Sequence, residues 1–364
     1  MRSRTPFKYL TLTIAVGLSL AFLLNACKKG STFTPPVTTS LQASIDSAKW
    51  YLAHTSEGTQ AGRYTKGTQA TLQTAVNSAL AVLATATSTA TQAQITAATA
   101  NLNAAIAAYE AGLITPIASS SLVAYWKFNG NALDSSGNGH SGTLEAGPVG
   151  LAAVPSGVPN LTADRFGNAN SAYHFAGGGN IDIPYTPSLN PKAMTISLWE
   201  RQDTAGRTDH AADCYMISLN RWNGWKFQIQ GTQRPFFTVN TDTSIYDRDG
   251  TVALTIGKTT GAGPWNHLVV TYDGAGTESY YINGTLVHTW TNLAGAIKVF
   301  SPTKDISIGT DLTNSSYTAT DDGTGRYYVA WGGYWTGDLD DIMIYNIPLT
   351  AAQVTQVYNQ QVTQ

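Results

Sequence analysis

Apolar residues between positions 41 and 115 recur at the three- and four-residue spacing of an α-helix. They form three stripes: Leu41, Ile45, Ala48 and Leu52; Leu72, Val76, Leu80 and Leu83; and Ile95, Leu102, Ile106, Tyr109 and Leu113. Amphipathic helices of this kind can bury their stripes only against one another, so the segment 41–115 is predicted to be a three-helix bundle. Thr91 and Gln94 match a capping box at the start of the last helix, and Gly112 is placed to end it.

After residue 120, the repeat of apolar residues changes from about 3.6 residues, typical of a helix, to two residues, typical of a β-strand. Short β-rich segments, separated by turns rich in Gly, Asp and Asn, lie at 122–128, 172–176, 194–201, 214–219, 225–230, 235–240, 251–256, 267–273, 279–290 and 339–345. This order predicts a large antiparallel sandwich over residues 120–364. Asn283–Gly284 predicts a type I′ hairpin, because both turn positions need a positive φ. Thr350 and Gln353 predict the cap of a last short helix.

The N-terminus has the pattern of an export signal. Arg2, Arg4 and Lys8 precede an uncharged, largely apolar run over 9–26, and Cys27 follows directly. Residues 1–26 are therefore predicted to be a signal peptide, with a single membrane-anchoring helix as the alternative. Residues 27–40, rich in Ser, Thr and Pro, are predicted to be a flexible linker.

Composition narrows the function classes further. Charged residues make up only 12% of the chain and the net charge is −2, so nucleic acid is not an expected partner. Cys27 and Cys214 are too few for a disulfide scaffold, a Cys-rich zinc site or an iron–sulfur cluster, and Cys214 is expected to be buried. The near-neutral total hides an acidic sandwich, since residues 117–364 carry a net charge of −7.

Leu24–Asn25–Ala26–Cys27 resembles the lipobox of bacterial lipoproteins, in which the cysteine becomes the lipidated N-terminus. The resemblance implies a Bacteroidetes-type lipoprotein that is held to the outer membrane by acyl chains on Cys27, with its cell-surface or periplasmic orientation left open. The segment TQAQITAATANLNAAIAAY resembles the FIVAR module of bacterial surface and sugar-processing proteins. That module implies a spacer or an accessory glycan-binding role. Trp50, Tyr51 and Tyr64 are assigned to helix packing, with an aromatic binding surface as the alternative.

Several stretches of the predicted sandwich resemble the LamG-like jelly roll of the concanavalin A-like lectin/glucanase superfamily. They are LVAYWKFNGNALDSSGNGHSGTL (122–144), TISLWER (195–201), WNHLVVTYDGAGTESYYINGTLV (265–287), ISIGTD (306–311) and GDLDDIMIYNIPLTAAQV (337–354). The resemblance implies two curved antiparallel sheets with Trp126, Trp199 and Trp265 inside.

A structural calcium ion is the predicted cofactor. Asp134 and Asn138 follow the first strand, and Asp340 and Asp341 lie at the start of the last, so their oxygens converge if these strands are neighbours. The resemblance implies calcium at this place and makes Asp340 the first choice of carboxylate. The alternative is that residues 134–139 form an Asx turn and the aspartates pair with Lys or Arg.

A carbohydrate site is predicted from tryptophans that the family's core does not need. Sugar rings stack on aromatic faces while their hydroxyls need polar partners, so one loop set must offer both. The loops 221–225 and 325–335 have this mixture. The candidate binding residues are Trp222, Arg326, Trp331 and Tyr334.

Catalysis is not expected. Glu145, Glu200 and Glu278 lie far apart, and the E-x-D-x-x-E run of laminarinase-type relatives is absent from the sequence. Other carboxylate pairs, including those from Asp203, Asp209 and Asp213, stay possible, and His210 is the one histidine worth testing. The predicted function is a lipid-anchored, non-catalytic carbohydrate-binding protein of the cell envelope. Its expected partners are a glycan or polysaccharide and other envelope lipoproteins; the alternatives are a protein-binding adhesion lipoprotein and a glycoside hydrolase.

Overall fold

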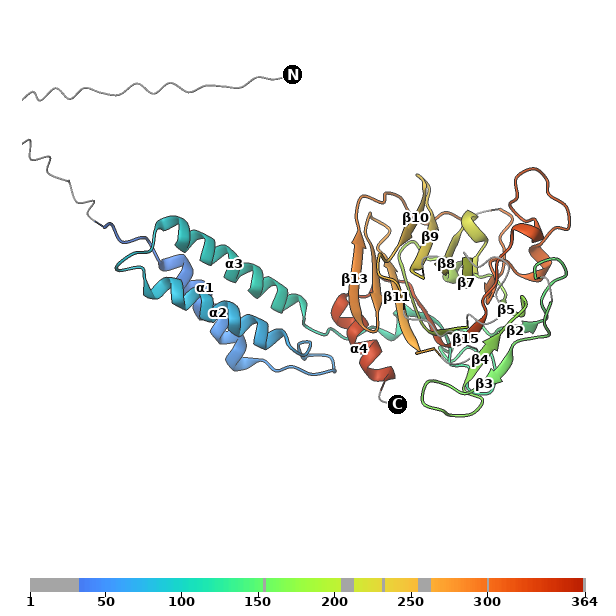
Figure 1. Cartoon of the computed structure of the whole chain (residues 1–364), viewed down its shortest axis with the longest axis horizontal. Coiled ribbons are helices and arrows are strands. Elements are labelled where there is room, and N and C mark those ends of the chain that lie inside the picture. Colours follow the sequence, from blue (N-terminus) through green and yellow to red (C-terminus); the bar gives the residue numbers. More distant parts are fainter. Residues whose placement is uncertain are drawn as a thin grey trace, which may run out of the picture.

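The computed structural model describes residues 33–152, 155–203, 213–230, 233–254, 263–299 and 301–362. They form a helical module followed by a β-sandwich (Figure 1). The predicted signal peptide, Cys27, Asp209 and His210 lie outside the described residues. Among the described helices, none is both long enough and apolar enough to cross a membrane.

The helical module consists of α1 (Thr39–His54), α2 (Thr68–Ala84) and α3 (Gln92–Ala111). The predicted stripes meet in one apolar cluster, which confirms the three-helix bundle. Both hydrogen bonds of the predicted capping box are present at Thr91, and Gly112 follows the last residue of α3. The assignment of Trp50 to helix packing is wrong, because its side chain is 55% exposed, whereas Tyr64 is buried.

The β-domain contains two antiparallel sheets, which confirms the predicted jelly-roll sandwich (Figure 1). One sheet has the order β13-β12-β11-β6-β15-β4-β3 with β1 paired to β15, and the other has the order β10-β9-β8-β7-β14-β5-β2. The strands of the first are β1 (Leu122–Trp126), β3 (Asn160–Thr162), β4 (Ala172–Phe175), β6 (Met194–Gln202), β11 (Asn266–Tyr272), β12 (Glu278–Ile282), β13 (Thr285–Trp290) and β15 (Gly337–Tyr345). Those of the second are β2 (Thr143–Glu145), β5 (Asn180–Ile183), β7 (Asp213–Leu219), β8 (Trp225–Gln230), β9 (Pro235–Asn240), β10 (Ile245–Asp249) and β14 (Ile306–Ile308).

Short helical elements close the ends of the sandwich. Five 3-10 turns are described: η1 (Ser119–Ser121), η2 (Pro187–Leu189), η3 (Arg221–Asn223), η4 (Asn314–Ser316) and η5 (Val329–Trp331). The C-terminal helix α4 (Ala351–Gln361) begins with the predicted capping box at Thr350. Its Val354 and Val357 pack against Val269, Tyr281 and Met343, so α4 covers the outer face of the eight-stranded sheet (Figure 1).

Of the three tryptophans predicted to lie between the sheets, only Trp126 is confirmed. Trp126, Trp225 and Trp335 are fully buried in the core between the sheets. Trp199 is also buried, but it stacks on Tyr358 of α4 at 5.8 Å between ring centroids and so lies on the outer face of its sheet. Trp265 is only half-buried, with the Arg201 guanidinium 5.0 Å from its ring centroid. Cys214 is buried, as expected.

Most predicted strands are present, with one error. The hairpin at Asn283–Gly284 is confirmed, with φ values of 50° and 75°. The strand predicted at 251–256 is wrong over 251–254, which are not in a strand, while 255–256 lie outside the described residues. The sheet instead ends in β10, whose residues are exposed or half-buried and so lack a clear apolar alternation.

Candidate functional site

The long loop between β14 and β15 carries three of the four predicted sugar-binding residues. Its two ends are joined by backbone hydrogen bonds, because Asp311 N donates to Gly333 O at 3.2 Å and Trp335 N donates to Gly309 O at 2.7 Å. Within the loop, Thr318 N donates to Tyr327 O at 2.8 Å. These hydrogen bonds therefore give the loop a defined conformation and attach it to the seven-stranded sheet.

A buried ion pair fastens this loop to the η3 turn. The Arg221 guanidinium pairs with the Asp311 carboxylate, and both side chains are fully buried. Arg221 Nη1 also donates to the carbonyl oxygens of Gly325 at 2.9 Å and Arg326 at 3.3 Å. The Tyr317 hydroxyl donates to Asp311, and burial together with the Asp311 charge raises the pKa of Tyr317 well above its ordinary value. The base of the loop is thus closed by charge-assisted hydrogen bonds.

The tip of the loop is held by two aspartates. Asp321 Oδ1 accepts hydrogen bonds from the backbone N–H of Gly323 at 2.9 Å and of Gly325 at 2.8 Å. Asp322 Oδ1 accepts from Thr324 N at 2.9 Å, and the hydrogen bonds from the Thr324 hydroxyl and backbone lower the pKa of Asp322. These are Asx turns, which order the backbone without a metal ion.

Trp331 stands on this tip and faces solvent. It is 60% exposed, although a large aromatic side chain is normally well buried. Its indole lies against Gly325, whose φ is +66°, and a Cβ there would be 3.2 Å from Trp331 Cε3. One side of the indole is thus supported by backbone, and the exposed part of the ring is available for a flat ligand.

The other three predicted residues lie in different surroundings. Trp222 of η3 is half-buried, with the Arg221 guanidinium 4.8 Å from its ring centroid, so the Arg221 contacts bring its turn alongside the loop tip. Arg326 is exposed next to Gly325. Tyr334 is only 8% exposed and packs with Leu151, Ala152 and Val329, so its ring supports the loop from below.

Sequence reasoning missed the residues that hold the site together. Arg221, Asp311 and Tyr317 lie in segments up to 96 residues apart, and a fully buried arginine is rare. The only available signal was that Arg221 precedes Trp222 and that Asp311 ends the stretch ISIGTD. Neither observation shows that Arg221 and Asp311 form an ion pair.

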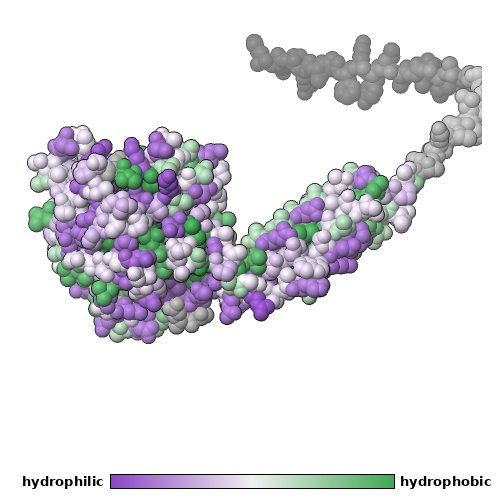
Figure 2. Space-filling view, turned by 180° about the vertical axis from the view of Figure 1, so that it is seen from behind, coloured by the Kyte–Doolittle hydropathy of each residue, from purple (hydrophilic) through white to green (hydrophobic). Residues whose placement is uncertain are grey.

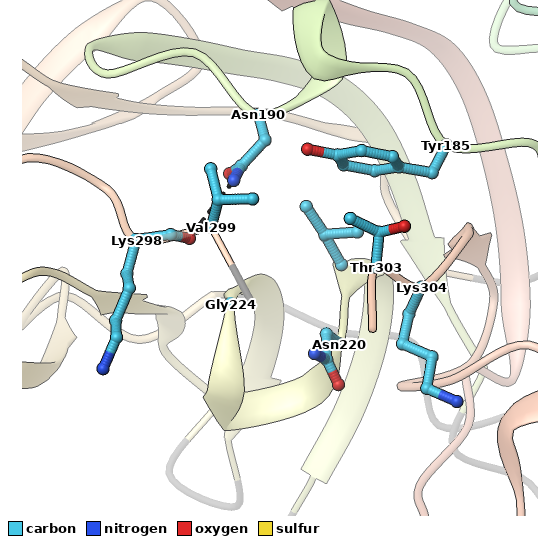
Figure 3. Close-up of a pocket in the computed structure, with 9 residues that line it drawn as sticks. Tyr185, Asn190, Asn220, Gly224, Lys298, Val299, Thr303 and Lys304 are labelled. Carbon is cyan, nitrogen blue, oxygen red and sulfur yellow. Dashed lines mark hydrogen bonds between the residues drawn. The ribbon is translucent and has the colours of Figure 1, made fainter. Parts of the chain in front are cut away.

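A small cavity lies beside the η3 turn, and Figure 3 shows it. It is lined by Tyr185, Asn190, Leu219, Asn220, Gly224, Lys298, Val299, Thr303 and Lys304. Its volume of about 10 Å³ holds one water molecule at most. The amino groups of Lys298 and Lys304 point away from its centre (Figure 3). It therefore cannot hold a sugar ring.

Three carboxylates gather at the other edge of the seven-stranded sheet. Asp182 of β5 is half-buried, and its burial, followed by the charges of Asp305 and Glu145, raises its pKa to about 6. Asp305 Oδ1 accepts a hydrogen bond from Tyr185 N at 2.7 Å. Glycoside hydrolases use a pair of neighbouring carboxyl groups, one of them with a raised pKa, as acid and base.

The predicted calcium ligands do not come together around one point. Asp134 accepts hydrogen bonds from Tyr125 N at 3.0 Å, Ser136 N at 2.8 Å and His140 N at 3.0 Å, which is the Asx-turn alternative and lowers its pKa. Asn138 Nδ2 donates to two backbone carbonyls, those of residues 122 and 123.

Asp340 and Asp341 instead pair with the Arg165 guanidinium, at 2.6 and 2.8 Å. Within the described part of the chain, no group of three or more His, Cys, Asp and Glu side chains is arranged to hold a metal ion. The side chains therefore do not fit a calcium ion at this place, and the calcium ion stays a prediction.

Comparison with known proteins agrees with the architecture. Residues 175–355 match the family described as the Concanavalin A-like lectin/glucanases superfamily. The two antiparallel sheets of the β-domain are consistent with the jelly-roll fold of that superfamily. A search of curated proteins gave no match.

Three solved structures illustrate the similarity in fold. Domain 4 of AbnA, an extracellular arabinanase from Geobacillus stearothermophilus in complex with arabinotriose, has 19% identity and a TM-score of 0.46, covering 65% of this chain and 98% of that one. The binding domain of Paraclostridial Mosquitocidal Protein 1 has 17% identity and a TM-score of 0.47, covering 67% of this chain and 53% of that one. The binding domain of Botulinum Neurotoxin DC in complex with SialylT has 15% identity and a TM-score of 0.43, covering 67% of this chain and 52% of that one. The chain thus spans about half of the two toxin structures.

Proposed function

We propose that this protein binds a glycan of the cell envelope or its surroundings without cleaving it, and that Trp331 is the central contact. The proposal depends mainly on the Trp331 indole, which is 60% exposed although the loop beneath it supports one side of the ring. A rigid aromatic platform stacks on the C–H face of a sugar at little cost in conformational entropy. The exposed guanidinium of Arg326 and the half-buried Trp222 extend the surface for hydroxyl and ring contacts.

We further propose that acyl chains on Cys27 anchor the protein in the outer membrane and that the helical module is a spacer. The lipobox resemblance supports the anchor, because it places a small residue and a cysteine directly after the apolar run. The elongated bundle between the linker and the sandwich supports the spacer (Figure 1). Other envelope lipoproteins are the partners we expect at this location.

A glycan array probed with residues 33–364 tests the binding proposal. Trp331→Ala should weaken binding by about 1–3 kcal/mol, the range found for a nucleobase stacked on an aromatic side chain, which is roughly 5- to 150-fold. Trp50→Ala is the comparison, since Trp50 is similarly exposed but belongs to α1, and a loss of binding by this variant instead would locate the sugar on the helical module. Retained binding by Trp331→Ala, or no sugar bound by the wild type, would contradict the proposal.

A glycoside hydrolase is the second candidate, because Glu145 and Asp182 lie on the paired strands β2 and β5, Asp305 directly precedes the neighbouring β14, and the pKa of Asp182 is raised in these surroundings. Release of soluble sugar from a bound polysaccharide, abolished by Asp182→Asn but not by Trp50→Ala, would establish it. An adhesion protein would instead present a flat apolar patch. On the face shown in Figure 2, apolar residues form small groups separated by polar ones, which favours the sugar over a protein partner on that face.

A further inference from the structure

Two neighbouring carboxylates are buried where β15 bulges. Asp340 and Asp341 are 2% and 6% exposed, and the pairing of β15 with β6 shifts register between Asp340 and Met343. Asp341 has a φ of +47°, so both carboxylates can be turned toward the β3–β4 loop. Burial and the neighbouring Asp341 charge raise the pKa of Asp340, so both carboxylates can be ionised together only with a positive charge between them.

Arg165 of the β3–β4 loop provides that charge. Its Nη1 lies 2.6 Å from Asp340 Oδ2 and its Nη2 lies 2.8 Å from Asp341 Oδ2. Nε and Nη2 also donate to the carbonyl oxygen of Gln361 in α4, at 3.2 and 2.9 Å. The side chain is only 6% exposed, so one guanidinium joins the bulge to the C-terminal helix.

Two aromatic rings fix the position of this guanidinium. Its central carbon lies 4.6 Å from the ring centroid of Phe166 and 4.5 Å from that of Trp199. The Tyr125 hydroxyl donates to the remaining oxygen of Asp341 at 2.5 Å. The arginine is therefore built into the fold, unlike a surface ion pair such as Arg234–Asp249.

A polar pocket of about 180 Å³ adjoins the ion pairs. Besides Arg165, Asp340 and Asp341, its lining includes Asn129, Asp164 and Asn168, which offer further oxygen atoms, and the exposed Lys127. Without the arginine side chain, the two aspartates would face this pocket and have room for a hydrated divalent cation. Oxygen ligands of this kind suit calcium.

We propose that Arg165 is a built-in substitute for a metal ion, so that the bulge of β15 is stable without calcium and becomes a calcium site only when Arg165 is removed. The carboxylates of Asp340 and Asp341 would bind either the guanidinium or the calcium ion. The guanidinium and a divalent ion are mutually exclusive there, because both must lie between the same oxygen atoms.

The test is thermal unfolding of the full chain with EDTA and with about 10 mM CaCl₂, far above the dissociation constants of weak extracellular calcium sites. The wild type should unfold at the same temperature in both. Arg165→Ser should unfold at a lower temperature in EDTA and regain about 5–10 °C in calcium, as expected for a ligand well above its dissociation constant. Arg234→Ser is the matched control, and calcium should not shift it.

Two results would overturn the proposal. One is a calcium-dependent rise in the unfolding temperature of the wild type, or calcium retained by it in equilibrium dialysis. The other is an Arg165→Ser variant that folds but responds to calcium no more than Arg234→Ser. If Arg165→Ser does not fold in either buffer, Arg165→Gln, which keeps a donor for the Gln361 carbonyl, replaces it under the same criteria.

Discussion

Replacing Arg221 by methionine tests whether the buried ion pair holds the binding loop. Methionine keeps much of the length and apolar volume of the side chain but removes its charge. The change leaves the fully buried Asp311 carboxylate without its cation, and the carbonyl oxygens of Gly325 and Arg326 without a donor. The Tyr317 hydroxyl still donates to Asp311, so part of its hydrogen bonding survives.

Breaking a buried ion pair by removing one partner costs about 3–5 kcal/mol, because the remaining charge is uncompensated. The retained Tyr317 contact favours the lower end, so we expect a loss of about 3 kcal/mol in the free energy of unfolding. For a domain of this size, that lowers the melting temperature by roughly 6–12 °C. Sugar binding should weaken as well, because Trp331 rests on the loop that Arg221 fastens.

Urea unfolding followed by tryptophan fluorescence measures the loss. Arg234→Met removes a partly exposed ion pair with Asp249 and should cost no more than about 1 kcal/mol. A second substitution, Asp311→Leu in the Arg221→Met background, should restore part of the stability, since no buried charge is left. A single-variant loss no larger than that of Arg234→Met would refute the reasoning.

Three further predictions concern stability alone. Burial raises the pKa of Glu278 to about 8, so its bound proton stabilises the fold at low pH and this contribution is lost as pH rises through 8. The free energy of unfolding of Glu278→Gln, measured in urea, should therefore rise relative to that of the wild type between pH 5 and 9, by at most about 5 kcal/mol. Thr350→Ala removes the cap of α4 and should cost about 1 kcal/mol, whereas Thr74→Ala is the comparison, because the Thr74 hydroxyl donates only to the Ala70 carbonyl of its own helix. Gly284→Ala puts a Cβ 2.8 Å from Tyr358 Cδ1 at a φ of +75° and should lower the melting temperature; no change would contradict the clash.

The fold could largely be predicted because its elements carry periodic apolar patterns. The helical stripes, both capping boxes and the Asn283–Gly284 turn depend on neighbours within a few residues, so the sequence contains the information that determines them. The edge strand β10 was missed because exposed or half-buried residues have no apolar alternation to detect. The same limit explains the strand misplaced at 251–256.

The site could be predicted only in part. The mixture of aromatic and polar residues in one loop singled out Trp331 and Arg326, which are exposed, but the exposure of a side chain is decided by contacts between distant segments. Tyr334 is buried through Leu151 of another loop, and Asp340 pairs with Arg165, which lies 175 residues away. Since no local pattern encodes such pairings, the sequence favoured the calcium ion and left the Asx turn at 134–139 and the pairing of the aspartates with Lys or Arg as the alternative.

The pairing of β1 with β15 has a mechanical consequence. β15 begins two residues after Trp335 at the end of the proposed binding loop, and β1 begins at the end of the segment that leads from the helical module. The two strands are antiparallel, with Leu122 opposite Tyr345 and Trp126 opposite Ile342. If the loop holds a glycan and Cys27 is anchored, as proposed above, a pull between them would draw each strand by its own first residue, in opposite directions. The hydrogen bonds between β1 and β15 would then be loaded in shear, all together rather than one after another.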